Sequence, residues 1–427
     1  MTSPQEQTWG TYNGETPTIQ AVNKDGQPSP YAKYFAPEDI IEVKLQESIS
    51  QYVVFGTIKF SDRGKYKMAV LMREGYDYIK MILKSNREDG GGYGEDKPLL
   101  FEILHIVGFE RGHTYGSVYD DFQITIAQFP AYRNLLVWKI SKGFENEKIS
   151  KIVKDIFDNF LNKNPDAQYD ADKTIEDTEG ELESFCVPFW SPYQTINYLK
   201  NYARAKDTKD AGFHSWFDLK NQFQFRSLKD IMENGDEHEI NLQDIVTTSI
   251  QDSQKDTQKV VNDYYPDFVH KEFYKIGLSG ASAERFNWFK KKEYTLKNGY
   301  LERPLKKQLN NLYEEPKDIN NMFGFHMTTG YRNEQDTTIC SALVYNQILT
   351  SMAAQVQTNI LINGITGETL MKAGDRVKIK NKVKGINENI EELEGDWSVR
   401  TVSHTWNTKG VPYRQVLALS RKTDFLH

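Results

Sequence analysis

The stretch that decides the fold reads FCVPFWSPYQTINYLKNYARAKDTKDAGFHSWFDLKNQFQFRSL and spans residues 185–228. It begins with a helix start: Ser191 stands at the N-cap position, Pro192 at the first helical position, and Gln194 completes an S-x-x-Q capping box. Apolar residues then recur at helical spacing, namely Ile196, Leu199 and Ala203, with Tyr198 and Tyr202 beside them. The sequence therefore predicts a helix that begins at Pro192.

The second half of this stretch alternates as two strands should. Phe213, Ser215 and Phe217 share one face of the first strand, and Lys220-Asn221 marks a turn. A second alternating run follows, with Phe223, Phe225 and Ser227 on one face. The segment is predicted to be helix, strand, turn, strand. Its basic and aromatic residues leave three roles open: a nucleic-acid surface, a catalytic site, or a packing unit within a larger assembly.

The length and the net charge of the chain limit the number of domains and the functions that the sequence allows. At 427 residues the chain exceeds one ordinary domain, and we expect roughly two to four. The formal net charge of -7 argues against general nucleic-acid binding, which needs clustered positive charge. The 24 tyrosines suit half-buried sheets and interfaces, because tyrosine joins an apolar ring to a polar tip.

Cysteine usage and the N-terminal sequence indicate the compartment. Cys186 and Cys340 form no C-x-x-C pair, so we expect two buried thiols in a reducing cytoplasm. The opening MTSPQEQTWG has no signal-peptide pattern, and no run approaches the ~18 apolar residues of a membrane-spanning helix. We therefore expect a soluble protein without stable membrane insertion.

Changes in the spacing of hydrophobic residues along the chain predict its domain boundaries. Residues 1–38 are polar and are expected to form a flexible N-terminal arm. Residues 39–135 change to a period of two and predict a first antiparallel β-barrel or sandwich. Its strand candidates are 53–60, 67–72, 76–85, 98–112 and 121–129.

An inserted α/β domain is expected at 136–235. It contains an amphipathic helix at 145–161, an acidic linker at 170–184 that reads as a solvated loop, and the helix and strand pair described above. Residues 236–335 show weak periodicity and predict an irregular connecting or interface segment.

Residues 336–427 predict a second β-barrel. Its strand candidates are 359–363, 367–380, 395–407 and 413–422, with a turn at 373–375. Alternation in the third of these strands places five residues on one face: Ser398, Arg400, Val402, His404 and Trp406.

The search for chemistry finds no catalytic, cofactor-binding or metal-binding residue to single out. The Gly-rich DGGGYGED (89–96) is followed by Pro98 and a strand rather than by a helix, so it predicts a hairpin tip and not a phosphate loop. His238, and the pair His105 and His113, lack the spacing of zinc ligands. His404 is expected to be a hydrogen-bonded strand residue at a barrel surface rather than a base.

Two regions together resemble a known family. The helix start has Trp190, Ser191, Ile196 and Leu199, and the closing β unit has a strand entry, a strand with His404 before a hairpin, and a final Tyr-to-Leu strand. The strand entry carries Gly367, Leu370, Gly374, Asp375 and Val377. This arrangement resembles the baseplate hub proteins of contractile-tailed bacteriophages, whose architecture is similar to the spike base of type VI secretion and related contractile injection systems. The resemblance covers about half of the chain; the arm and residues 236–335 show no family pattern.

The resemblance implies a mainly β, α+β fold: two tube-like antiparallel β-barrels with an inserted α/β domain, assembling as a ring. It implies a homotrimer in the virion tail baseplate, assembled in the host cytoplasm, that joins a threefold central spike to the sixfold tail tube. The other expected partners are the tail tube initiator or tube protein, the tape-measure protein and neighbouring baseplate wedge proteins, with DNA only in transit. Because the sequence stops after the last barrel strand, the spike is expected to be a separate chain.

The family's role is structural, so we expect no enzyme activity and no cofactor. Two alternatives of other classes stay open. One is a tail-associated cell-wall hydrolase, because a glycosidase needs only two carboxylates. The other is a single-stranded nucleic-acid-binding module that uses FNWFKKKEY (286–294), with Lys290, Lys291 and Lys292 as phosphate contacts.

Overall fold

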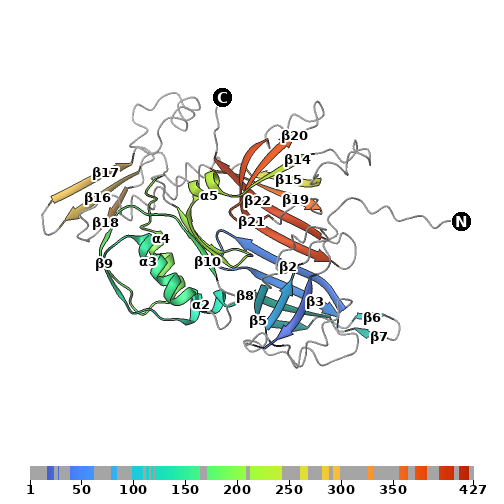
Figure 1. Cartoon of the computed structure of the whole chain (residues 1–427). Coiled ribbons are helices and arrows are strands. Elements are labelled where there is room, and N and C mark those ends of the chain that lie inside the picture. Colours follow the sequence, from blue (N-terminus) through green and yellow to red (C-terminus); the bar gives the residue numbers. More distant parts are fainter. Residues whose placement is uncertain are drawn as a thin grey trace.

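The computed structural model describes the regions that form the main sheet, the insert and a small separate sheet (Figure 1). The residues described are 17–23, 27, 39–61, 78–83, 99–108, 112–114, 117–119, 121–163, 171–207, 212–242, 260–267, 281–287, 292–298, 326–329, 355–363, 371–381, 394–407 and 413–422. Several predicted features lie wholly or partly outside the described residues. They include the strand at 67–72, parts of the strands at 76–85, 98–112 and 367–380, the loop at 89–96, part of the segment 286–294, Cys340, and the pair Gly367 and Leu370.

The main sheet has twelve strands, and its first half runs in the order β1-β4-β5-β8-β3-β2 with every neighbour antiparallel. This half curls around a hydrophobic core that includes Val43, Leu45, Ile58 and Phe101. Its strands are β1 (Thr18–Val22), β2 (Ile40–Ser48), β3 (Phe55–Ser61), β4 (Tyr78–Ile82), β5 (Leu99–Gly108) and β8 (Asp121–Gln128). The prediction of a flexible arm is wrong for Thr18–Val22, because these residues pair in register with β4 and bury Ala21 and Val22.

The second half of the sheet contains β14 (Glu237–Leu242), β15 (Val260–Asp267), β19 (Gln355–Asn363), β20 (Arg376–Asn381), β21 (Gly395–Asn407) and β22 (Tyr413–Lys422). The strands predicted at 395–407 and 413–422 are confirmed. β14 and β15 come from the segment that was predicted to be irregular, and β14 pairs parallel with β20, so this half is not purely antiparallel. The weak periodicity of residues 236–335 did not predict these strands, because the strands that pair with them lie far away in the sequence.

The strand β21 joins the two halves. Its N-terminal part pairs with β20, its C-terminal part pairs with β2, and β22 runs along its other edge. The register shifts between Val399 and Thr401, as in a β-bulge. Trp397 and Val399 therefore lie in the core of the second half, whereas Trp406 lies in the core of the first. The prediction that Ser398 and Arg400 share a face with Trp406 is wrong, because the bulge reverses the alternation.

The insert packs two helices against a three-stranded sheet of order β10-β13-β12. The capping box is confirmed: the Ser191 side chain accepts from Gln194 N, and the Gln194 side chain accepts from Ser191 N. The elements are α2 (Ala131–Val137), β9 (Gly143–Glu147), α3 (Ile149–Ile156), the π-helical turn η3 (Phe157–Leu161), β10 (Asp172–Ile175), β11 (Leu182–Cys186), α4 (Pro192–Lys200), β12 (Phe213–Phe217), β13 (Gln222–Ser227) and α5 (Leu228–Asn234).

Three local predictions in the insert need correction. The helix predicted at 145–161 starts later, because Gly143–Glu147 pairs with β11 as a strand. The linker at 170–184 contains β10 and part of β11, since its polar residues alternate with residues that face the core. Cys186 is exposed rather than buried, at the end of β11.

The sheet of the insert has two different faces, as its alternation predicts. Phe213, Phe217, Phe223 and Phe225 lie in a core with the helices α3 and α4. Trp216 and Gln224 are opposed across β12 and β13 and lie on the other face. That face is turned toward α5 and the second half of the main sheet.

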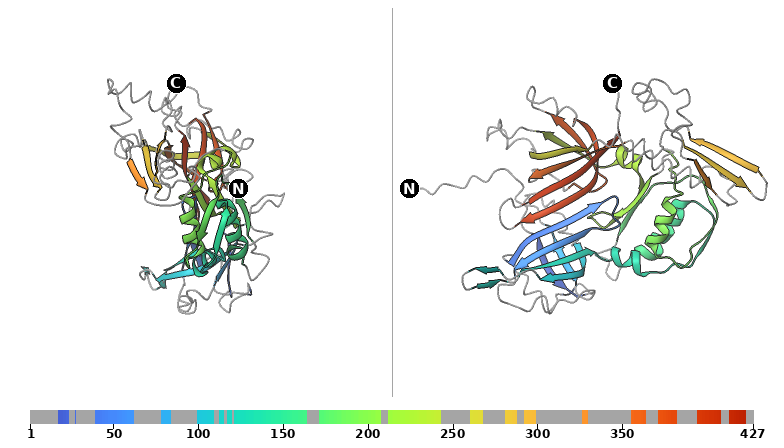
Figure 2. Two further views of the ribbon diagram at one scale, coloured as in Figure 1. Left: turned by 90° about the vertical axis from the view of Figure 1, so that its left-hand side faces the viewer. Right: turned by 180° about the vertical axis from the view of Figure 1, so that it is seen from behind.

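Two small sheets complete the described chain. The first contains β6 (Gly112–Thr114) and β7 (Ser117–Tyr119), and the second contains β16 (Ala281–Asn287), β17 (Lys292–Asn298) and β18 (His326–Thr329). Figures 1 and 2 show the insert and the β16–β18 sheet on one side of the molecule and the main sheet on the other. Lys292 begins β17, whereas Lys290 and Lys291 are not among the described residues. No helix in the described ranges is long and apolar enough to cross a membrane.

Candidate functional site

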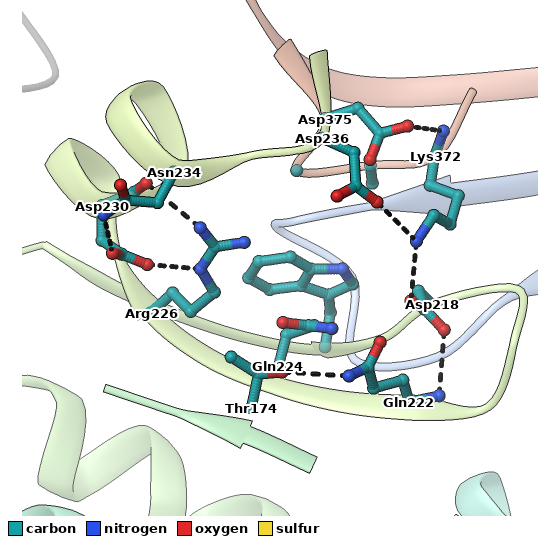
Figure 3. Close-up of a pocket in the computed structure, with 13 residues that line it drawn as sticks. Thr174, Asp218, Gln222, Gln224, Arg226, Asp230, Asn234, Asp236, Lys372 and Asp375 are labelled. Atoms are coloured by element: carbon teal, nitrogen blue, oxygen red, sulfur yellow. Dashed lines mark hydrogen bonds and ion pairs between the residues drawn. The ribbon is translucent and has the colours of Figure 1, made fainter. Parts of the chain in front are cut away.

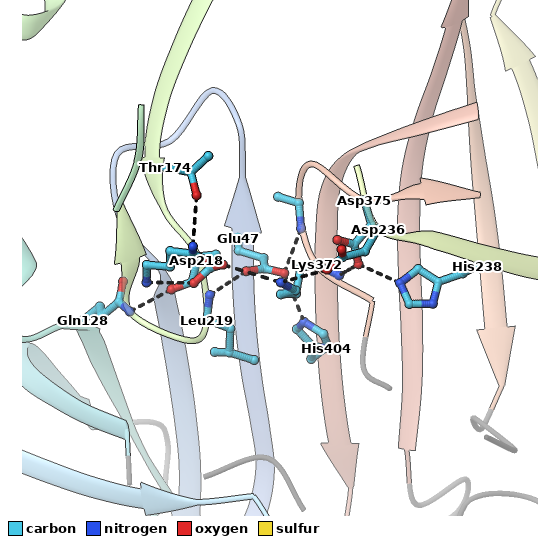
Figure 4. Close-up of polar contacts among 12 residues, drawn as sticks. Glu47, Gln128, Thr174, Asp218, Leu219, Asp236, His238, Lys372, Asp375 and His404 are labelled. Carbon is cyan, nitrogen blue, oxygen red and sulfur yellow. Dashed lines mark hydrogen bonds and ion pairs between the residues drawn. The ribbon is translucent and has the colours of Figure 1, made fainter. Parts of the chain in front are cut away.

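The insert and the two sheet halves meet at one buried carboxylate, Glu47 of β2. Its Oε2 accepts a hydrogen bond of 2.9 Å from the backbone N–H of Leu219 in the insert. Its Oε1 accepts one of 2.9 Å from the backbone N–H of Ala373 in the second half. The Glu47 side chain is 0% exposed. We call this region, formed by Glu47, Asp218, Leu219, Lys372, Ala373 and Asp375, the joint (Figure 4).

Asp218 and Lys372 add a buried ion pair to the joint. Asp218 Oδ1 accepts from Gln222 N at 2.9 Å, and Lys372 Nζ lies 3.7 Å from Asp218 Oδ2 and 3.6 Å from Asp236 Oδ2. Burial raises the pKa of Asp218 to about 6, Lys372 opposes this rise, and Glu47 adds to it. The pKa of Lys372 is raised even though burial acts to lower it, because Asp218 and its other acidic neighbours outweigh that effect. The joint thus holds three carboxylates, those of Glu47, Asp218 and Asp375, around one ammonium group.

The turn before β20, residues 373–375, is held in place by hydrogen bonds of Asp375. Asp375 Oδ2 accepts from the backbone N–H of Lys372 at 2.8 Å and lies 2.9 Å from His238 Nε2. His238 is therefore a structural partner of Asp375. His404 was expected at a barrel surface, but it is 0% exposed, with Nδ1 3.2 Å from Gln415 Nε2 and Nε2 3.9 Å from Glu47 Oε1. His404 follows the bulge in β21, and its side chain lies beside Glu47 of the joint.

The same turn needs a glycine. Gly374 has a φ of +92°, a conformation that side-chain-bearing residues rarely adopt. A Cβ at this position would lie 2.8 Å from Cζ2 of Trp216. The indole of the insert therefore packs directly on the backbone of the second half. The turn predicted at 373–375 is confirmed, and its glycine serves contact between domains as well as chain reversal.

A cavity of about 310 Å³ lies beside the joint, between the polar face of the insert, α5 and the turn at 373–375 (Figure 3). Arg226 in its wall pairs with Asp230, and Gln222 Nε2 donates to Thr174 Oγ1 at 3.0 Å. Trp216 Nε1 and Gln224 Oε1 are buried, and neither has a hydrogen-bond partner among the residues that the structure describes. Buried polar groups are normally satisfied by protein or water, so the cavity suits bound water or a small polar group.

The hydrogen bonds of the joint connect the insert to the two halves of the main sheet. The described residues contain no group of three or more His, Cys, Asp or Glu side chains placed to hold a metal ion. Sequence reasoning singled out Gly374, Asp375 and His404, and the structure brings all three to this region. It missed Glu47, although one signal was present: Val43, Leu45 and Glu47 share the inward face of β2, where a third apolar residue is expected.

Comparison with known proteins gives the fold. No protein-family model matches the sequence, and no curated protein matches it. A tail protein from Neisseria meningitidis MC58 aligns over 95% of this chain and 97% of its own, with 7% identity and a TM-score of 0.56. A 43 kDa tail protein of prophage MuSo2 from Shewanella oneidensis aligns over 95% and 98%, with 9% identity and a TM-score of 0.56.

A component of the type VI secretion system of Escherichia coli aligns over 95% of this chain and 76% of its own, with 9% identity. Its TM-score of 0.46 is too low to establish a shared fold. The likeness to the two tail proteins spans nearly the whole of each chain, including both sheet halves and the insert between them. This chain therefore has the fold of phage tail proteins.

Proposed function

We propose that this chain is a structural baseplate hub of a contractile phage tail. The observation that carries the proposal is its fold, which matches two phage tail proteins over 95% of the chain. At 7% and 9% identity that likeness concerns the fold, and the role is our inference from it. The proposed role is that of an adaptor without enzymatic chemistry, located in the tail of the virion.

The construction of the chain supports an adaptor. Its two sheet halves are hydrogen-bonded to each other through β2 and β21 and tied to the insert by Glu47. Each half has its own core, so each can serve as one tube-like barrel in a ring. Three chains would then present six such units around a channel, which lets a threefold spike meet a sixfold tube.

The remaining features of the proposal rest on the family resemblance of the sequence. The partners are two further copies of the chain, the central spike, the tube or its initiator, the tape-measure protein and wedge proteins, with DNA only passing through. In this proposal residues 39–135 make the first barrel together with β1, residues 336–427 contribute to the second, and residues 136–235 are the insert. Residues 236–335 connect the insert to the second barrel and lend it β14 and β15.

The native mass of the purified full-length chain tests the proposal. We expect a mass of three times 49.5 kDa, and negative-stain images of that species should show a ring with a central hole. Because a spike can template a trimer, the same measurement is made after co-expression with the neighbouring tail genes. A chain that stays monomeric in both preparations contradicts the hub role. The described residues offer no specific observation in favour of the hydrolase or the nucleic-acid interpretation.

A further inference from the structure

The cavity beside the joint has two buried polar atoms in its wall whose hydrogen-bonding capacity no described residue uses, Trp216 Nε1 and Gln224 Oε1. Trp216 is 1% exposed and Gln224 is 7% exposed, so little of either side chain reaches bulk water. The two residues pair in register across β12 and β13, and directly opposed residues of antiparallel strands project from the same face of a sheet. An N–H donor and an oxygen acceptor therefore lie beside each other on one wall of the cavity.

Lys372 lines the same cavity and lies between two carboxylates, those of Asp218 and Asp236 (Figure 3). Its Nζ is 3.7 Å from Asp218 Oδ2 and 3.6 Å from Asp236 Oδ2. Both distances exceed the ~2.7–3.2 Å of an N–H···O hydrogen bond, so the ammonium group attracts these two oxygens without donating a hydrogen bond to either. A group placed beside them can accept a hydrogen bond from Lys372 and donate one to a carboxylate.

The charges around the cavity argue against an ion as its occupant. Four carboxylates and two basic groups line it, namely those of Asp218, Asp230, Asp236, Asp375, Arg226 and Lys372. Because Arg226 already pairs with Asp230, the excess of negative charge would repel an anion. A cation would be attracted, but it offers no acceptor to the N–H of Trp216, which is only a donor. An uncharged group that both donates and accepts matches Trp216 and Gln224 together.

The volume of the cavity indicates an occupant larger than one water molecule. A single water needs a cavity of about 10–15 Å³, whereas this cavity measures about 310 Å³. Pockets that bind small molecules typically range from about 300 to 1,000 Å³. The cavity therefore suits a small molecule at the lower end of that range.

We propose that this cavity binds a small uncharged polyol, of the size of glycerol or a single sugar ring. Each hydroxyl group both donates and accepts hydrogen bonds. One hydroxyl accepts from Trp216 Nε1 and donates to Gln224 Oε1, and another accepts from Lys372 Nζ and donates to Asp236. A simple amide carries its donors and its only acceptor on one rigid plane, so it meets one of these two places rather than both. The bound polyol contacts the insert and the segment before β20, and so connects the insert to the second half of the main sheet.

NMR of the full-length chain labelled with ¹⁵N-tryptophan tests this site, because the indole N–H of Trp216 is itself a proposed contact. The chain has 7 tryptophans; Trp216→Phe assigns the Trp216 resonance, and the other indoles report general solvent effects. Glycerol, glucose and N-acetylglucosamine are titrated separately, with acetamide as an uncharged amide. We expect a saturable shift of the Trp216 resonance with at least one polyol, half-maximal at about 1–10 mM. A shift with acetamide but with no polyol overturns the proposal, and so does no shift with any probe, because the cavity then holds only water.

Two variants with a matched control show whether the shift comes from this cavity. Gln224→Met keeps the length of the side chain but removes the amide, and it should weaken polyol binding by about tenfold or more. Gln46→Met, at an exposed glutamine of β2, is the control and should bind as wild type does. Asp236→Ala removes an acceptor whose side chain is 75% exposed, so this variant should fold normally, bind more weakly, and decide alone if Gln224→Met does not fold. Binding by the two variants that equals binding by Gln46→Met overturns the proposal.

Discussion

Replacing Glu47 by glutamine tests whether one carboxylate holds the joint together. Glutamine keeps the shape of the side chain but has one oxygen where the carboxylate has two. One of the two backbone N–H groups, Leu219 or Ala373, must then face an NH₂ group instead of an acceptor. An unsatisfied buried N–H costs about 1–3 kcal/mol, and loss of charge from the remaining hydrogen bond costs about 1 kcal/mol more. We therefore expect Glu47→Gln to destabilise the contact by roughly 2–4 kcal/mol.

Hydrogen exchange of the backbone amides measures this directly. At Leu219 and Ala373 the opening free energy should fall, so exchange at one or both should accelerate by a factor of roughly 30 to 1,000, since about 1.4 kcal/mol corresponds to tenfold. Glu145→Gln, at an exposed residue of β9, is the matched control and should change stability by less than about 0.5 kcal/mol. If Glu47→Gln exchanges like this control, the carboxylate does not hold the three units together.

Two further predictions concern the joint. Gly374→Ala should lower the free energy of unfolding by about 2–5 kcal/mol, because of backbone strain at positive φ and the clash with Trp216. Gly143→Ala, which has open space around its added Cβ, is the control and should not lower it. Equal Tm values for the two variants would contradict the contact between Gly374 and Trp216. Asp218, whose pKa burial raises from 3.8 to about 6, contributes stability that is present below pH 3.8 and lost as the pH rises through 6. Relative to Asp218→Asn, wild type should therefore lose up to about 3 kcal/mol between pH 4 and 7 in denaturant titrations. His214, with a lowered pKa, has the opposite pH dependence but is common to both proteins, so a flat difference would contradict the reasoning.

Local signals were sufficient to predict much of the fold. The capping box predicted the start of α4, and period-two alternation predicted β12, β13, β21 and β22 within a residue or two. These elements are encoded by residues a few positions apart. The resemblance noted in the sequence depended on the same elements, and the structural likeness to phage tail proteins confirms it, together with a mainly β fold.

Features that depend on distant partners were not predicted. Thr18–Val22 is a short run within a polar N-terminal segment, and it forms a strand because β4 is available to pair with it. The bulge at Arg400 reverses which side of β21 faces the core, and nothing in the alternation marks it. Glu47 gave one usable signal, a charge at an inward strand position, but its two partners lie 172 and 326 residues away along the chain. Sequence periodicity shows that such a charge needs a partner without showing which one.

The insert is held by contacts along one short segment, residues 47–52, at the end of β2 and just after it. Glu47 binds the N–H of Leu219, the carbonyl of Ile49 meets His214, and the carbonyl of Tyr52 accepts from Phe217 N at 3.0 Å. These contacts fix where the insert lies against β2, but contacts along one line leave it free to rotate about that line. Contacts with the turn before β20 hold the insert at a second element of the main sheet: Trp216 packs on Gly374, and Lys372 Nζ lies 3.7 Å from Asp218 Oδ2. Because Glu47 binds both Leu219 and Ala373, its carboxylate connects these two sets of contacts.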